Sequence, residues 1–276
     1  MNLIDQVSQS TGLELKEINI LPARKDFVAK VEKDGIMMLL KAVELSEERE
    51  RSLQKEARIL QSLRNFTGDL YVANGEVDGH FWLLRKWLDG KTATKQTTYI
   101  RENPTVLGNK QQFIADICQM LEKVVELYEL GYLHGDLQPG HFIFAPDGEM
   151  YLIDLELTVD LRETNPIYRG ALAHYVPPET AKGMLASSQR IPLDAVSEIY
   201  SFGAVVFYLY TRVVPVAYSH SMEDPSYDLE FNDMLQASRS NPIRRVGMYT
   251  DRAKRCQSFS ELLCVLKEIN VMMERG

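Results

Sequence analysis

The pattern of apolar residues changes near residue 90, and this change limits the folds that the chain can adopt. Before it, short apolar runs alternate with turn signals, and one segment, 46–65, repeats apolar residues at helical spacing. After it, longer segments with apolar residues three and four positions apart dominate, most clearly at 111–130. The chain is therefore predicted to be α+β, with a strand-rich part, 1–89, followed by a mostly helical part, 90–276.

The first part predicts a small antiparallel sheet with one helix. Residues 26–44 contain two apolar runs around a turn at 33–35, which is a hairpin pattern. Residues 69–90 contain two further strand-like stretches, with Asn-Gly and Asp-Gly turn signals at 74–75 and 78–79. The helical segment between these strands has four apolar residues on one face: Leu53, Ala57, Leu60 and Leu63.

The second part predicts several helices and one hairpin. Residues 91–110 are polar and lack a clear period, so they are expected to form a connector or an insertion. The helix at 111–130 is expected to end at Gly131. Two strands, 141–144 and 150–157, are expected to pair across a Pro-Asp-Gly turn. Further helices are expected at 194–213 and 256–273.

The composition argues against two classes of partner. A net charge of −8 over 276 residues disfavours nucleic acid and anionic membrane surfaces, because both need clustered Lys and Arg. The longest apolar run, 202–210, is about half of a bilayer-spanning helix, so no membrane span is expected. The three cysteines match no metal pattern, and the N-terminus is acidic where a secretory signal would be basic. We expect a cytoplasmic protein with reduced thiols.

Four charged residues beside apolar runs are candidates for chemistry. Asp136 follows the long helix in a loop, and Asp154 ends an apolar strand. Aspartate is rarely buried without a partner, so the two together suggest a metal site or proton transfer, whereas either one alone would be a turn cap. Lys41 ends another strand run, and Glu56 lies fifteen residues on, within reach of its ammonium group.

The order of these residues resembles the protein kinase superfamily. Lys41 matches the lysine of the third strand and Glu56 matches the glutamate of the following helix. The segment HGDLQPGH (134–141) resembles the H-R-D-x-x-x-x-N catalytic loop, and IDLE (153–156) resembles the D-F-G motif. Three later segments are similar to the family's remaining signatures: GALAHYVPPE (170–179), SEIYSFGAVVFYLYTR (197–212) and KRCQSFSELLCVL (254–266).

The resemblance implies one kinase-like domain with a bilobal fold, in which 1–89 is the N-lobe and 90–276 is the C-lobe. It implies ATP-dependent transfer of the γ-phosphate to Ser or Thr of a protein substrate. By this resemblance, Lys41 would hold the α- and β-phosphates and Glu56 would orient it. Asp136 would accept or orient the proton of the attacking hydroxyl, and Arg255 would pair with Glu179.

Nucleotide binding departs from the family pattern in one place. The glycine-rich phosphate loop is expected near 20–30, yet that stretch contains no glycine. Arg24 and Lys25 could neutralise phosphate charge there, or form a solvated basic turn. The resemblance implies that adenine lies against the backbone of 84–88, which makes three further residues candidates for cofactor binding: Arg85, Lys86 and Trp87.

The expected metal site departs from the pattern in two places. His141 occupies the position of the metal-binding Asn, and imidazole suits Mn²⁺ better than Mg²⁺. Glu156 replaces the glycine of D-F-G, and residues two apart on a strand face the same side. Asp154 and Glu156 are therefore expected to form a paired carboxylate site for Mg²⁺, with Mn²⁺ as the alternative, unless Glu156 points to solvent.

The catalytic loop departs from the pattern as well. Gly135 replaces the arginine of H-R-D, and Glu198 stands where an aspartate usually anchors this loop. A phosphate on the loop 157–176 would therefore lack its usual partner, which disfavours activation by phosphorylation at Thr158, Thr164 or Tyr168. Any activity is expected to be constitutive or controlled by a protein partner.

Three functions stay open. The first is an active, divergent Ser/Thr protein kinase, favoured because Lys41, Glu56, Asp136 and Asp154 are all present. The second is a non-catalytic pseudokinase scaffold, suggested by the missing glycines and by His141. The third is a small-molecule kinase of the aminoglycoside or sugar kinase type, suggested by the HGDLQP sequence and by Glu156, although the P-P-E segment and Arg255 argue against it. The oligomeric state is open.

Overall fold

The chain is described by a computed structural model that covers residues 2–22, 26–45, 47–164, 166–168, 170–172, 174–186, 191–218, 229–231 and 252–275. These residues belong to two compact units. The first unit is Met1–Asp89 together with Ile153–Glu156, and the second is Gly90–Leu152 together with Leu157–Gly276. A short segment that follows the hairpin of the second unit therefore groups with the first unit.

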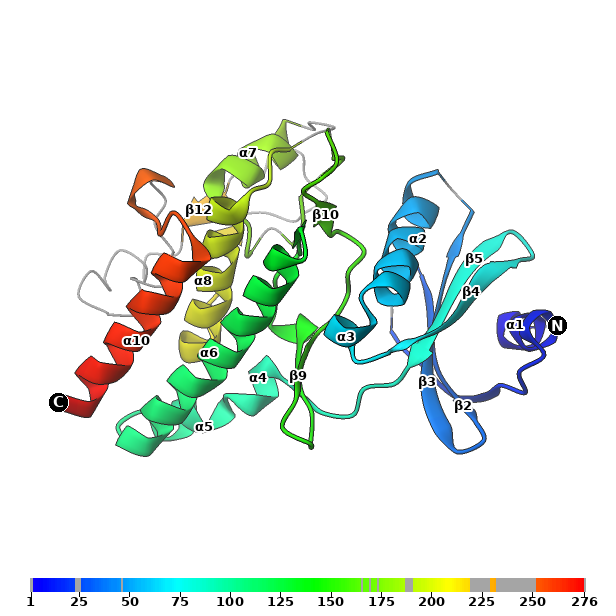
Figure 1. The fold of residues 1–276 in the computed structure, drawn as a ribbon, viewed down its shortest axis with the longest axis horizontal. Helices are drawn as coiled ribbons and strands as arrows, with labels where there is room; N and C mark the ends of the chain where they lie inside the picture. The colour runs from blue at the N-terminus through cyan, green and yellow to red at the C-terminus, as the bar shows by residue number, and fades with distance from the viewer. Residues whose placement is uncertain are drawn as a thin grey trace. The chain divides into compact units, whose positions relative to one another are not determined.

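The first unit contains a five-stranded antiparallel sheet in the order β1-β2-β3-β5-β4 (Figure 1). The strands are β1 (Lys16–Ile20), β2 (Phe27–Lys33), β3 (Ile36–Glu44), β4 (Tyr71–Val77) and β5 (His80–Lys86). The hairpin turn between β2 and β3 is confirmed, because Asp34 and Gly35 join these strands with positive φ. The sequence therefore predicted this part of the sheet correctly.

One predicted turn is wrong. Asn74 and Gly75 lie inside β4 and not at a turn. A Cβ on Gly75 would lie 2.9 Å from the ring of Trp82 on the neighbouring strand. The glycine therefore makes room for an aromatic side chain, which a search for turn residues cannot distinguish from a turn.

Two helices cover the two faces of this sheet. α1 (Leu3–Thr11) places Ile4 and Val7 against a core on one face that includes Leu40 and Trp82. α2 (Glu47–Ser62) packs against β3 and β5. Since side chains alternate along a strand, α2 lies over the face that carries the odd-numbered residues of β3, including Lys41.

The sequence missed α1 and extended α2 too far. Asn2 caps α1, since its side chain accepts a hydrogen bond from Asp5 N at 2.8 Å, and Gly12 ends the helix in the left-handed conformation. Both capping signals are present in the sequence. Leu63, expected on the apolar face of α2, lies after the helix, at the N-cap of the short α3 (Arg64–Thr67).

The second unit is mostly helical. Its helices include α6 (Leu107–Glu129), α7 (Pro178–Leu185), α8 (Ala195–Thr211) and α10 (Phe259–Arg275), and α6 packs against α10. Three antiparallel strands form a small sheet: β6 (Lys91–Thr92), β8 (Phe142–Phe144) and β9 (Met150–Leu152). The remaining paired strands are β7 (Tyr132–Leu133) with β10 (Val159–Asp160), and β11 (Val216–Tyr218) with β12 (Leu229–Phe231).

The segment 91–110 is more structured than a connector. It contains β6, α4 (Ala93–Gln96) and α5 (Thr98–Glu102). Ala93, Thr97 and Ile100, spaced four and three residues apart, are all buried. The three positions have helical spacing in the sequence, but one of them is a threonine among polar neighbours, so the apolar pattern is too weak to predict a helix.

The fold class is confirmed as α+β, because a five-stranded antiparallel sheet precedes a helical region. Within the residues that the structure describes, no helix combines the length and the apolar character that a membrane crossing requires.

Candidate functional site

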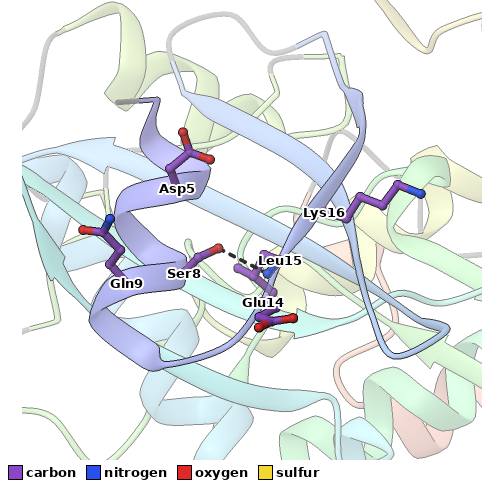
Figure 2. Close-up of a pocket in the computed structure, with 6 residues that line it drawn as sticks. All are labelled: Asp5, Ser8, Gln9, Glu14, Leu15 and Lys16. Atoms are coloured by element: carbon purple, nitrogen blue, oxygen red, sulfur yellow. Dashed lines mark hydrogen bonds between the residues drawn. The ribbon is translucent and has the colours of Figure 1, made fainter.

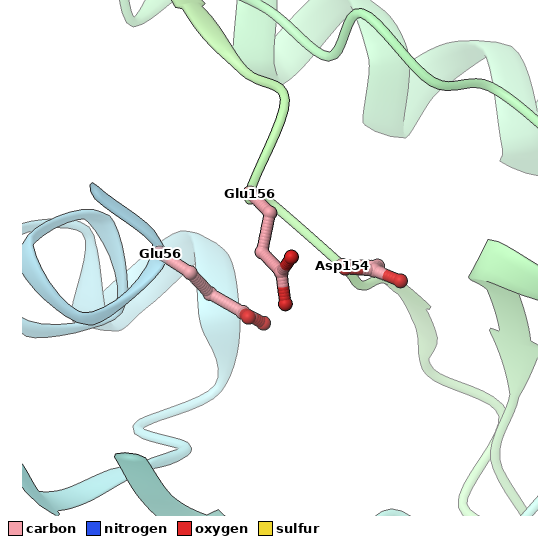
Figure 3. Close-up of side chains that lie close together, drawn as sticks. All are labelled: Glu56, Asp154 and Glu156. Carbon is pink, nitrogen blue, oxygen red and sulfur yellow. The ribbon is translucent and has the colours of Figure 1, made fainter. Parts of the chain in front are cut away.

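A cluster of charged side chains surrounds Lys41 in the first unit. The Lys41 ammonium group lies 2.8 Å from Glu56 Oε2, 3.2 Å from Asp154 Oδ1 and 3.0 Å from Glu156 Oε1. One carboxylate oxygen from each of the three acids lies within 4.8 Å of those of the other two. Figure 3 shows the carboxyl groups of Glu56 and Glu156 turned toward each other, with Asp154 beside them. One ammonium thus serves three carboxylates.

Three separate elements bring this cluster together. Lys41 lies on the face of β3 that α2 covers, and Glu56 extends from α2 with only 1% of its side chain exposed. Asp154 follows β9 in the left-handed conformation, with φ 65°. Aspartate tolerates this conformation better than most side chains. The backbone therefore turns sharply at the residue that is expected to bind metal.

Glu156 joins the cluster for a reason that differs from the one predicted. The strand β9 ends at Leu152, so Asp154 and Glu156 are not neighbours on one face of a strand. Glu156 lies in a turn, and its side chain still reaches Lys41. The structure therefore brings Glu156 close to Asp154, while the alternation argument that predicted this is wrong.

The cluster changes the proton affinities of its members. Burial alone would lower the pKa of Lys41, but Glu56, Asp154 and Glu156 raise it above its usual value, so the ammonium stays charged. Burial, with the nearby negative charges of Glu56 and Asp154, raises the pKa of Glu156 to about 7, and Lys41 opposes this rise. The charge of Glu156 thus changes near neutral pH.

The donor set of this cluster fits a hard divalent cation. Its three acids offer only carboxylate oxygens, the ligands that Mg²⁺ and Mn²⁺ prefer. The Lys41 ammonium already offsets part of their charge, so a cation would share these carboxylates with it. In the second unit, Nδ1 of His141 lies 2.9 Å from the carbonyl oxygen of Asp136 and must donate to it. In the neutral form of this ring the lone pair is then on Nε2, the arrangement that metal-binding histidines commonly have.

The carboxylate of Asp136 is held in a fixed position in the second unit. Its Oδ2 accepts from Gln138 Nε2 at 3.0 Å, and its Oδ1 accepts from the backbone N–H of Leu172 at 3.3 Å. The side chain of Asp136 is 15% exposed. The sequence did not identify Gln138 as a partner, although it lies only two residues from the aspartate. These contacts fix the orientation of a carboxylate that keeps part of its surface exposed.

Gly135 and Glu198 anchor this loop. The backbone N–H of Gly135 donates to Glu198 Oε1 at 2.8 Å, and its carbonyl oxygen accepts from the Tyr168 hydroxyl at 2.7 Å. Gly135 has φ 78°, and a Cβ would lie 2.5 Å from Leu157 O, so an arginine could not stand there. Burial raises the pKa of Glu198 to about 7, while hydrogen bonds from the backbone of Gly135 and His134 lower it.

Two of the three candidate phosphorylation sites are buried. Thr158 is 0% exposed and Tyr168 is 4% exposed. Burial also raises the pKa of the Tyr168 hydroxyl, which donates a hydrogen bond to the carbonyl oxygen of Gly135. Thr164 is exposed.

A partly buried ion pair links the start of α7 to the segment before α10. Arg255 binds Glu179 through two hydrogen bonds, of 2.5 and 2.8 Å. Arg252, which the sequence did not single out, donates to the same carboxylate at 3.1 Å and also bonds Asp194. The pair therefore exists as the resemblance implies, within a larger network.

The residues expected to bind nucleotide are found in different settings. Arg24 and Lys25 lie outside the described residues. Lys86 is exposed and pairs with Asp69 at 3.3 Å. The indole N–H of Trp87 bonds Asp89 at 3.1 Å, and the Lys30 ammonium lies 4.3 Å from the centre of the Trp87 ring.

Arg85 differs from its neighbours because its side chain is buried, with 7% exposed. Burial lowers its pKa, and the negative charges of Glu56 and Asp154 oppose this shift. A second buried cation therefore lies within the electrostatic reach of the Lys41 cluster. No pattern in the sequence indicated that this arginine is buried.

A surface cavity of about 580 Å³ lies beside α1, and its lining includes no residue of the Lys41 cluster (Figure 2). Its lining is Asp5, Ser8, Gln9, Glu14, Leu15 and Lys16. Figure 2 shows the hydrogen bond from the backbone N–H of Leu15 to Ser8 Oγ, which is 3.2 Å long. This bond fastens the end of α1 to the chain leading into β1, so the cavity is a depression at that joint.

Comparison with known proteins finds protein kinases. No protein-family model matches the chain. A protein named "Probable serine/threonine-protein kinase" from Clostridium acetobutylicum is 29% identical over 149 residues, or 52% of this chain and 20% of that protein. "Dual specificity protein kinase TTK" from Mus musculus is 25% identical over 132 residues, or 42% of this chain and 15% of that protein. A second "Probable serine/threonine-protein kinase", from Dictyostelium discoideum, is 24% identical over 187 residues, or 66% of this chain and 14% of that protein. The chain thus spans at most 20% of the length of these relatives.

Proposed function

We propose that this protein kinase-like chain transfers the γ-phosphate of a purine nucleoside triphosphate such as ATP to Ser or Thr of a protein substrate. The observation that carries this proposal is the Lys41 cluster, in which Glu56 lies 2.8 Å from the ammonium group and two further carboxylates adjoin it. Phosphoryl transfer depends mainly on positioned charges, and this cluster supplies both signs of charge in one place.

Each charged residue of the Lys41 cluster has a role in this proposal. Lys41, oriented by Glu56, binds the α- and β-phosphates. Asp154 and Glu156 hold Mg²⁺ or Mn²⁺ through their carboxylate oxygens. When bound, the cation supplies neutralisation of the charge that develops on the phosphates.

Asp136 acts on the acceptor in this proposal. It orients the attacking hydroxyl and accepts its proton, and Gln138 together with the Leu172 amide holds its carboxylate in place. The bidentate pair between Arg255 and Glu179 supports a protein substrate over a small molecule, because it belongs to the segments that resemble protein kinases.

Matched aspartate variants test the proposal. Purified chain, ATP and either Mg²⁺ or Mn²⁺ are assayed for phosphate transfer to a generic protein substrate and to the chain itself. Asp136→Asn and Asp154→Asn are each expected to reduce transfer by about 100-fold or more. Asp34→Asn is the control, since Asp34 and Asp154 both have positive φ but Asp34 lies in an exposed turn. Equal transfer in all variants would contradict the proposal.

A second candidate is a non-catalytic nucleotide-binding module. The observation that favours it is that the Lys41 ammonium is already shared by three carboxylates, so phosphates must displace or rearrange them. This candidate predicts a thermal shift with nucleotide and metal but no transfer to protein or to a small hydroxyl compound such as an aminoglycoside. If nucleotide causes no shift with either metal, both candidates fail as stated.

A further inference from the structure

Arg85, the penultimate residue of β5, has a buried guanidinium group with an unused donor. Its Nη1 donates to the backbone carbonyl oxygen of Lys86 at 3.1 Å. Its Nε is buried and has no hydrogen-bond partner among the described residues. Among the residues that the structure describes, no carboxylate lies within ion-pair distance of Arg85, and Arg85 is only 7% exposed. A buried donor without a partner is costly, so a bound group that accepts a hydrogen bond from it would be stabilised.

The register of the sheet places Arg85 beside the Lys41 cluster. Leu83 of β5 lies opposite Lys41 of β3, and Leu39 lies opposite Arg85. Because side chains alternate along a strand, Arg85 and Lys41 point to the same face, the one that α2 covers. The charges of Glu56 and Asp154 act on Arg85 as well. The guanidinium group therefore borders the site that is proposed to bind the nucleotide.

The backbone around Arg85 has few hydrogen-bonding groups left for a base. The N–H of Lys86 donates to Leu70 O at 2.8 Å, and the N–H of Trp87 donates to Met37 O at 2.9 Å. The carbonyl oxygen of Lys86 already accepts from Arg85. An amino group on a bound base would therefore compete with Arg85 for this acceptor, whereas an acceptor on the base would find a guanidinium donor.

On the basis of the proposed function, and with the base placed against 84–88 as the resemblance to protein kinases implies, we infer that Arg85 selects purines with a carbonyl group at C6, so that GTP and ITP bind more tightly than ATP. A guanidinium group can only donate hydrogen bonds. Guanine and hypoxanthine present two acceptors along this edge, O6 and N7, which match the arginine fork. Adenine presents N7 beside a 6-amino donor, which would face the donors of Arg85.

Nucleotide titrations test this inference directly. The affinities of the whole chain for ATP, GTP and ITP are measured by calorimetry with Mg²⁺ and again with Mn²⁺. ITP differs from ATP only at N1 and C6, so it isolates the carbonyl from the 2-amino group of guanine. GTP and ITP are expected to bind more tightly than ATP by a factor on the order of 10 to 100.

Two variants assign the preference to the side chain. Arg85→Met retains a long apolar stem and is expected to abolish or reverse the preference, and Arg85→Lys is expected to retain part of it because a single ammonium cannot bind O6 and N7 together. Arg64→Met, at an exposed arginine that pairs with Asp69, is the control. If Arg85→Met does not fold, the three affinities of the unmodified chain still decide the question.

The outcomes separate this inference from the proposed function. Equal affinities, or a preference for ATP, would overturn the inference even if phosphate transfer occurs. An equal loss of affinity for all three nucleotides in Arg85→Met would show that Arg85 binds phosphate and would also overturn it. A preference for GTP and ITP without transfer would support the inference while contradicting the proposed enzymatic function. Failure to bind any of the three would overturn both.

Discussion

Two glutamates, the partly buried Glu156 in the first unit and the buried Glu198 in the second, have similar proton affinities but different surroundings. Burial is the first cause that raises the pKa of Glu156 and of Glu198, in both cases to about 7. Glu156 faces an ammonium group and two carboxylates, whereas Glu198 accepts hydrogen bonds from the backbone. A charged ligand can change the surroundings of Glu156, but it cannot replace the backbone N–H groups that bond Glu198. The same pKa therefore marks a candidate functional group in one unit and a structural anchor in the other.

The largest expected effect comes from removing the cation of the functional cluster. Lys41→Met leaves three carboxylates together, one of them the nearly fully buried Glu56. Uncompensated buried charge should lower the free energy of unfolding by about 3 kcal/mol or more. Denaturant unfolding at neutral pH measures this loss. Adding Glu156→Gln to the variant should recover part of it, and no recovery would show that the carboxylates do not act as a unit.

Gly135 donates a hydrogen bond to the structural anchor Glu198, and substitution of Gly135 is expected to destabilise the protein nearly as much as substitution of Lys41. Gly135→Ala adds a Cβ 2.5 Å from Leu157 O at a residue with φ 78°, so the loop must shift. The expected loss of stability is about 2–4 kcal/mol, and phosphate transfer should fall with it. Gly140→Ala in the same loop is the control, since a Cβ there meets nothing within 4 Å. Equal stability of the two variants would contradict this role of Gly135.

The charge of Glu198 should make stability depend on pH. The pKa of Glu198 is about 7 in the folded protein and 4.5 for an ordinary glutamate, so the folded state holds a proton that the unfolded state releases. Stability from this group is complete below about pH 4.5 and is lost as the pH rises to about 7, by roughly 3 kcal/mol in total. Unfolding of Glu198→Gln across this range should show a weaker decline. Parallel curves for the two proteins would rule out Glu198 as the source.

The smallest effect is expected at an exposed ion pair. Lys33 lies 2.7 Å from Asp34, but the Asp34 side chain is 78% exposed. Solvent screens such a pair, so Lys33→Met should change the free energy of unfolding by less than about 0.5 kcal/mol. The same lysine-to-methionine change at Lys41 and Lys33 thus separates a buried cluster from a surface pair. A loss at Lys33 equal to that at Lys41 would mean that the substitution itself is harmful.

The local sequence determined the elements that carry their own signals. The hairpin at Asp34 and Gly35 could be predicted because these residues adopt positive φ readily. The pairing of Lys41 with Glu56 could be predicted from their order on a strand and a helix, together with the resemblance to protein kinases. The capping residues Asn2 and Gly12 are equally visible in the sequence, although α1 itself was not predicted.

Tertiary structure decided which charged side chains meet. Alternation along a strand predicted the right partner for Asp154 with the wrong geometry, since Glu156 reaches Lys41 from a turn. Nothing local distinguishes Arg85 from an exposed arginine, because its burial depends on α2 and on a strand register set far away in the sequence. The sequence by itself therefore determined the two hairpins of the first unit, the main helices and the identities of the acids and bases. Packing decided their burial, and burial determines their charge and their chemistry, because the cost of holding a charge depends on the water that the fold removes.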